Sequence, residues 1–182
     1  MLVIHPKDKT TDMLSVLYEG TEHTRIDQDC GSNKLCHLLH HTPKNERIML
    51  LGHGSDKGLF SRKNDDQDVF DRFMVNHTHA FQLRQHGANI VGVWCHANLF
   101  AKAEGLHGLF SGMIVTEMSE ALLYEIKTTQ KELDVENVKL AQRLRTLLDE
   151  NIPLSDIPTR MRELYDAHTP LTSFNYANFH YL

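Results

Sequence analysis

The sequence lacks the features that mark secreted, membrane-spanning and nucleic-acid-binding chains. It has three cysteines in 182 residues and no CxxC pair, which argues against a disulfide framework and favours a reducing compartment. No run of 18 apolar residues occurs, and no basic stretch precedes a long apolar one at the N-terminus. Lysine and arginine are scattered and the net charge is -5, which argues against general nucleic-acid binding. We therefore expect a cytoplasmic protein without a membrane or nucleic-acid partner.

The thirteen histidines do not have the spacing of a metal site. His40 is followed directly by His41, and His77 is separated from His79 by one residue. Histidine ligands on a helix bind best at positions i and i+4, and zinc needs a third or fourth ligand as well. We expect these side chains to be solvated histidines on helix faces, and we expect neither a metal nor another cofactor.

Short apolar runs alternate with helical stretches over the first two thirds of the chain, which is typical of an α/β fold with a mainly parallel sheet. The predicted strands are Leu2–Ile4, Ile48–Leu51, Asn89–Trp94 and Gly112–Thr116, with a weak edge strand at Thr24–Asp29. The charged stretch 61–71 is predicted to be a surface loop, and His107-Gly108 to end a helix. From residue 128 the pattern is helical, with an apolar stripe at Leu140, Leu144, Leu147 and Leu148. We expect one domain over residues 1–182, a three-layer sandwich with flavodoxin-like strand order, on which a helical extension of residues 128–182 packs.

Two of the predicted strands end in residues with reactive side chains. Ile48–Leu51 leads into Gly52-His53-Gly54, and Asn89–Trp94 leads into Cys95. One loop and one helix separate the two strands, so a right-handed crossover would make them neighbours about 4.8 Å apart.

A histidine and a cysteine at neighbouring strand ends can together break an amide bond. The thiolate is the nucleophile, and an imidazole can take the thiol proton and later return it to the leaving amine. Gly54 has no side chain to obstruct a substrate carbonyl, so its N–H and that of Cys95 can form an oxyanion hole. Cys30 and Cys36 are expected to be structural.

An apolar strand that ends in His-Gly, followed about 40 to 50 residues later by one that ends in Cys, resembles the caspase-like cysteine peptidases. These include caspases, metacaspases, legumains, gingipains and separases. The resemblance covers roughly residues 2–126 and implies a caspase-like strand order, His53 as general acid and base, Cys95 as nucleophile, and Gly54 and Cys95 as oxyanion donors. It has two departures. Val93-Trp94-Cys95-His96-Ala97 replaces Gln-Ala-Cys-x-Gly, which leaves specificity for aspartate unsupported, and helices follow the fifth strand where a sixth strand is expected. The aromatic tail, residues 171–182, is predicted either to pack as a strand or to lie along the surface.

The substrate expected from this resemblance is a peptide or protein. Glu117 or Glu120, after the fifth predicted strand, would supply an acidic pocket for a basic residue of that substrate. Two alternatives stay open. The chain could be a non-catalytic caspase-like binding or assembly module whose residues 128–167 form a partner surface, or a cysteine hydrolase of a non-peptide amide or ester.

Overall fold

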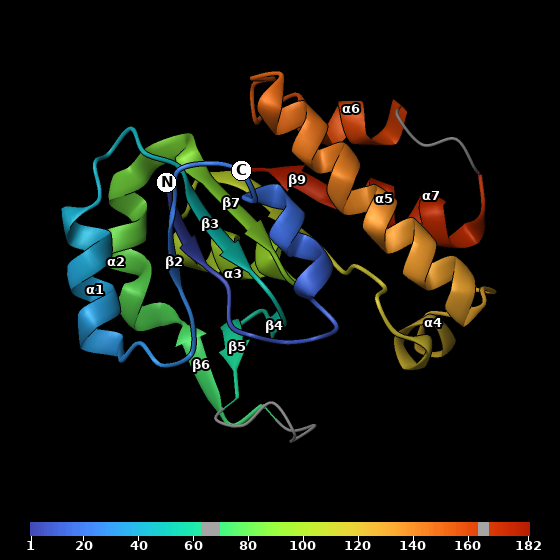
Figure 1. Ribbon diagram of the computed structural model, residues 1–182, viewed down its shortest axis with the longest axis horizontal. Coiled ribbons are helices and arrows are strands. Elements are labelled where there is room, and N and C mark those ends of the chain that lie inside the picture. The colour runs from blue at the N-terminus through green and yellow to red at the C-terminus, as the bar shows by residue number, and fades with distance from the viewer. Residues whose placement is uncertain (63–69, 164–167) are drawn as a thin grey trace.

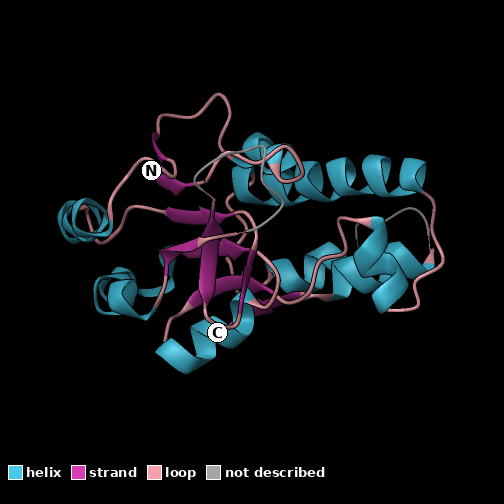
Figure 2. Ribbon diagram, turned by 90° about the horizontal axis from the view of Figure 1, so that it is seen from below, coloured by secondary structure: helices cyan, strands magenta, loops and turns pink. Residues whose placement is uncertain are grey.

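The computed structural model describes residues 1–62, 70–163 and 168–182. The strands of its main sheet are β1 (Leu2–Ile4), β2 (Thr24–Ile26), β3 (Ile48–Leu51), β7 (Ile90–Val93), β8 (Gly108–Ser111) and β9 (Phe179–Tyr181). They lie in the order β2-β1-β3-β7-β8-β9; the first five are parallel and β9 is antiparallel to β8. This is the expected three-layer α/β sandwich, in which the strands lie between two groups of helices (Figures 1 and 2).

The helical layers explain why the strands are continuous apolar runs. On one face lie η1 (Asp12–Leu17), α5 (Gln130–Asp149) and α6 (Ile157–Glu163), and on the other α1 (Ser32–His41), α2 (Ala80–Leu83) and α3 (Ala97–Glu104). In β3, Met49 and Leu51 pack in the cluster that contains α5, whereas Ile48 and Leu50 pack in the cluster that contains α1. A strand covered on both faces has no solvent-facing positions for polar side chains.

A second, three-stranded antiparallel sheet follows the carboxyl end of β3. It consists of β4 (Gly54–Ser55), β5 (Gly58–Ser61) and β6 (Arg72–Val75). Of the predicted loop 61–71, Ser61 belongs to β5, and positions 63–69 lie outside the described residues. The remaining helical segments are η2 (His77–His79), η3 (Arg84–Asn89), α4 (Met118–Leu123) and α7 (Pro170–Ala177).

The predicted fifth strand was wrong, because the chain forms its strand four residues earlier, as β8. His107-Gly108 does not end a helix; Gly105, with φ 61°, is the C-cap of α3, and Gly108 opens β8. A Cβ on Gly108 would lie 2.3 Å from the Ile90 carbonyl oxygen of β7, so only glycine permits this strand approach. Residues 113–115 are buried but do not pair with any strand of the main sheet. Because they are buried they are apolar, and this apolar run was predicted to be a strand.

The C-terminal region contributes to both the sheet and the core. Of the two arrangements predicted for the aromatic tail, the chain forms the strand, because its last residues return as β9 and pair with β8. The stripe of Leu140, Leu144, Leu147 and Leu148 on α5 is buried in the cluster that also contains η1, as its spacing predicted. Among the described residues, no helix is long and apolar enough to cross a bilayer.

Candidate active site

The candidate site lies at the carboxyl ends of the central parallel strands. The strand order reverses between β1 and β3, and in such sheets the loops on either side of this switch point diverge and leave a crevice for a ligand. The loop after β1 carries Asp8 and Thr10, and His53 follows β3. Cys95 follows β7, which pairs with β3 in the register Leu51 to Val93. The prediction that the strands leading to His53 and Cys95 are neighbours is therefore confirmed.

His53 and Cys95 line the same cavity, which has a volume of about 30 Å³. Its other walls come from the loop and helix after β1, the strand ends and α5: Thr11, Met13, Leu14, Gly52, Val93, Trp94, Ile114, Thr116 and Leu140. Most of this lining is apolar.

His53 is held through its Nε2 atom. This atom lies 2.6 Å from the Thr10 hydroxyl oxygen and 3.8 Å from Asp8 Oδ1. The Phe70 ring packs against the imidazole with centroids 5.0 Å apart. Burial lowers the pKa of His53, an effect that Glu117 and Glu120 partly oppose. The imidazole is therefore neutral at neutral pH, which is the form that can accept a proton.

Cys95 lies in surroundings that favour the thiol over the thiolate. Its Sγ atom is 3.7 Å from the Ile114 carbonyl oxygen and 3.8 Å from Glu120 Oε1. Burial, and after it the negative charge of Glu120, raises the pKa of Cys95 to about 12. The structure thus holds a protonated thiol and a neutral imidazole, and no preformed thiolate–imidazolium pair.

Gly54 is constrained by packing as well as by its place beside His53. A Cβ there would lie 2.1 Å from Trp94 Cδ1 and 2.5 Å from the Gly58 carbonyl oxygen. The Phe60 N–H donates to the His53 carbonyl at 2.7 Å, which makes Gly54 and Leu59 a non-hydrogen-bonded pair of the β4–β5 ladder. In such a pair the N–H is directed away from the partner strand, so the Gly54 N–H is not used within this sheet.

The backbone reverses sharply directly after Cys95. His96 has φ 67° and ψ 26°, in the left-handed region, and α3 begins at the next residue. The His96 N–H donates to the Gly112 carbonyl at 3.1 Å, which holds the reversal in place. A non-glycine residue in this conformation costs roughly 1 kcal/mol, and such strain is concentrated at functional sites.

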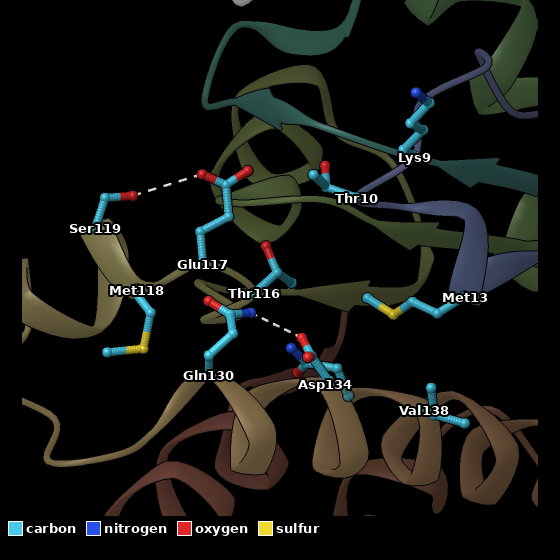
Figure 3. A pocket seen from close by; sticks show the side chains of 11 residues that line it. Lys9, Thr10, Met13, Thr116, Glu117, Met118, Ser119, Gln130, Asp134 and Val138 are labelled. Atoms are coloured by element: carbon cyan, nitrogen blue, oxygen red, sulfur yellow. Dashed lines mark hydrogen bonds between the residues drawn. The ribbon is translucent and has the colours of Figure 1, made fainter.

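A larger groove of about 600 Å³ adjoins the cavity, since Met13 and Thr116 line both. Figure 3 shows the Glu117 carboxylate on one side of Thr116 and, on the other, the Asp134 carboxylate, which accepts a 2.7 Å hydrogen bond from Gln130. Of the two predicted substrate-binding residues, only Glu117 lines this groove.

Glu120, the other predicted substrate-binding residue, is turned toward the protein. Its Oε2 atom accepts hydrogen bonds from the backbone N–H groups of Thr116 at 2.8 Å and Glu117 at 3.2 Å. These bonds hold its Oε1 atom beside Cys95. Its contacts are therefore those of a residue that fixes the start of α4 and the surroundings of the thiol.

Asp8, Thr10 and Arg62 also belong to the site, although they were not predicted from the sequence. Thr10 donates to Asp8 Oδ1 at 2.7 Å, and Arg62, which follows β5, forms an ion pair with Asp8 Oδ2. The available signal was the polar stretch after the first predicted strand, because strand ends on both sides of a switch point contribute to a site.

The described residues contain no group of three or more potential metal ligands. His40 and His41 are exposed on α1, as expected. The expectation of a solvated His79 was wrong: it is buried, and its Nδ1 atom accepts from the Asn76 N–H at 3.2 Å. His77 Nδ1 lies 2.9 Å from the Glu104 carboxylate.

No family model, curated protein or solved structure matches the chain. What the protein does is therefore inferred from the geometry of its own residues.

Proposed function

We propose that the protein is a cysteine peptidase in which Cys95 is the nucleophile and His53 the general acid and base. The observation that carries this proposal is the shared cavity: two neighbouring parallel strands end in an imidazole and a thiol that line one space next to a groove. The sharp reversal at His96, directly after the thiol, supports the proposal.

The neutral state of both groups defines how the reaction would begin. The substrate carbonyl is attacked by Cys95 Sγ while His53 takes the thiol proton, so that the thiolate does not accumulate beforehand. The S–C bond forms as the carbonyl π-electrons move to oxygen. The N–H groups of Gly54 and Cys95 are the proposed donors to this oxyanion.

Collapse of the tetrahedral intermediate breaks the C–N bond, and His53 gives its proton to the leaving amine. Water, activated by the same imidazole, then hydrolyses the thioester and restores the Cys95 thiol. The apolar lining of the cavity would exclude other water molecules during the first step.

The charge and the apolar surface of the groove favour a substrate with a basic side chain. Glu117 and Asp134 supply negative charge, and Met13 and Val138 offer apolar surface for the methylene groups of lysine or arginine. Lys9 lies at the same groove, so the charge is not uniform. In peptides that differ only at the residue before the cleaved bond, we expect lysine to be preferred over norleucine, and Glu117→Gln to reduce that preference.

One observation favours a non-catalytic binding or assembly module instead: the Glu120 carboxylate beside Cys95 opposes thiolate formation. A hydrolase of non-peptide amides or esters would use the same dyad on another acyl group.

One set of assays separates these functions. The purified chain, Cys95→Ala and the matched control Cys36→Ala are each incubated with a peptide library and with simple aryl esters and amides. The proposal expects hydrolysis of peptides that Cys95→Ala abolishes and Cys36→Ala retains. Hydrolysis of esters alone would support the non-peptide hydrolase. Hydrolysis that survives Cys95→Ala, or none by the unaltered chain, would contradict catalysis by Cys95.

A further inference from the structure

The Asp8–Thr10–His53 contacts allow the proton on each of these groups to be assigned. Asp8 is buried, with a side chain 5% exposed, and forms an ion pair with Arg62. The positive charge of Arg62 favours the ionised form of the carboxylate. An ionised carboxylate only accepts hydrogen bonds. Asp8 Oδ1 accepts one from the Thr10 N–H at 2.9 Å and one from the Thr10 hydroxyl at 2.7 Å.

A threonine hydroxyl has one proton, and here that proton is donated to Asp8. In its 2.6 Å contact with His53 Nε2, the Thr10 oxygen must therefore be the acceptor. The proton of the neutral imidazole consequently lies on Nε2, and the lone pair lies on Nδ1.

We infer that Thr10, oriented by Asp8, fixes His53 as the Nε2–H tautomer, so that Nδ1 is the atom that takes the proton of Cys95. The inference rests on the proposed function, and it makes Thr10 and Asp8 positioning residues for the base. Asp8 has a second effect: once Nδ1 is protonated, the imidazolium carries its charge near a carboxylate oxygen 3.8 Å from Nε2. Arg62 connects this arrangement to the end of β5, a segment distant in sequence.

The tautomer can be measured without any substrate. Long-range ¹⁵N–¹H NMR spectra distinguish a protonated ring nitrogen from one with a lone pair, and His53→Gln identifies the signals of His53 among the thirteen histidines. The unaltered chain should show the proton on Nε2. Thr10→Val, which has nearly the same shape but no hydroxyl, should give a mixture of tautomers. Thr10→Ser keeps the hydroxyl and should restore the single form.

Kinetics supply the second readout. On a peptide that the chain cleaves, Thr10→Val should lower kcat by about tenfold or more with little change in KM. That loss is smaller than the roughly 10⁴-fold loss caused by a substitution that inverts the tautomer in a serine-protease triad. Thr10→Ser should stay within about threefold of the unaltered chain, since it provides the same acceptor.

The outcomes separate this inference from the proposed function. A proton on Nδ1 in the unaltered chain, or a single Nε2–H form that persists in Thr10→Val, would overturn the inference even if Cys95-dependent hydrolysis is found. An Nε2–H form that depends on the Thr10 hydroxyl, without Cys95-dependent hydrolysis, would support the positioning of His53 and overturn the proposed peptidase.

Discussion

The carboxylate of Glu120 lies 3.8 Å from the sulfur of Cys95 and raises the pKa of that thiol together with burial, which is the larger cause. Three donors near the start of α4, the N–H and hydroxyl of Thr116 and the N–H of Glu117, all bond to its Oε2 atom, which leaves Oε1 beside Cys95. Cys95 is thus kept as a thiol at rest, and in the proposed reaction its proton passes to His53 only when a substrate is bound.

Glu120→Gln removes the negative charge beside Cys95 and should therefore lower the pKa of the thiol. The larger thiolate fraction should increase the rate of Cys95 alkylation by iodoacetamide at pH 8 by about threefold to tenfold, since the gain in thiolate is partly offset by lower nucleophilicity. Peptide mapping by mass spectrometry follows Cys95 separately from Cys30 and Cys36. Glu163→Gln, on α6, is the matched control and should have no effect. An unchanged rate in Glu120→Gln would show that Glu120 does not control the thiol.

Acid should destabilise the fold through His5. This side chain is fully buried, with Nδ1 2.9 Å from the Tyr18 hydroxyl, and burial, followed by the charge of Arg25, lowers its pKa to about 4. The unfolded chain binds a proton at His5 near pH 6.5, and the folded chain only near pH 4. Stability is therefore fully present above pH 6.5 and falls on acidification between these values, by at most about 3 kcal/mol from this group.

Urea unfolding at pH 7 and pH 4.5 measures this loss. His79 and His86 also have lowered pKa values and add to it in the same direction. His5→Gln keeps a polar group near Tyr18 but does not titrate. Between pH 7 and pH 4.5 its free energy of unfolding should therefore fall by about 2 kcal/mol less than that of the unaltered chain. An equal loss in both proteins would rule out His5 as the main acid-sensitive group.

Gly54→Ala should destabilise the protein whether or not it is an enzyme. The added Cβ would overlap with the Trp94 ring and the Gly58 carbonyl, and the free energy of unfolding should fall by about 2 kcal/mol or more. Gly31→Ser is the control, because the space at that position is open and a serine N-cap suits α1. Equal thermal stability of Gly54→Ala and the unaltered chain would show that the turn can move away from Trp94.

The strands that position His53 and Cys95 could be predicted because their signal is local. Ile48–Leu51 and Ile90–Val93 are continuous apolar runs, and a crossover of one loop and one helix makes them neighbours by a general rule of handedness. The helix α5 could equally be predicted from its leucine stripe, and it begins at Thr129, whose hydroxyl accepts from the Glu132 N–H at 3.2 Å.

The parts that could not be predicted depend on contacts distant in sequence. β9 has few residues and becomes a strand only because β8 offers it an edge, so the sequence left two arrangements of the tail open. The proximity of Glu120 to Cys95 depends on the path of residues 112–116, which were predicted to be a strand but lie outside the sheet. Asp8 and Thr10 meet His53 across the switch point, and a single sequence shows only that polar residues follow β1.

The central claim, that His53 activates Cys95 toward an acyl substrate, is tested most directly by an electrophilic peptide that needs both groups. A lysyl chloromethyl ketone peptide is incubated with the unaltered chain, with His53→Ala and with Cys95→Ala, and the modified residue is identified by mass spectrometry. We predict a thioether on Cys95 that forms about 100-fold or more slowly in His53→Ala, and none at this position in Cys95→Ala. Labelling of Cys95 at the same rate with and without His53, or preferential labelling of Cys30 or Cys36, would contradict the proposed dyad.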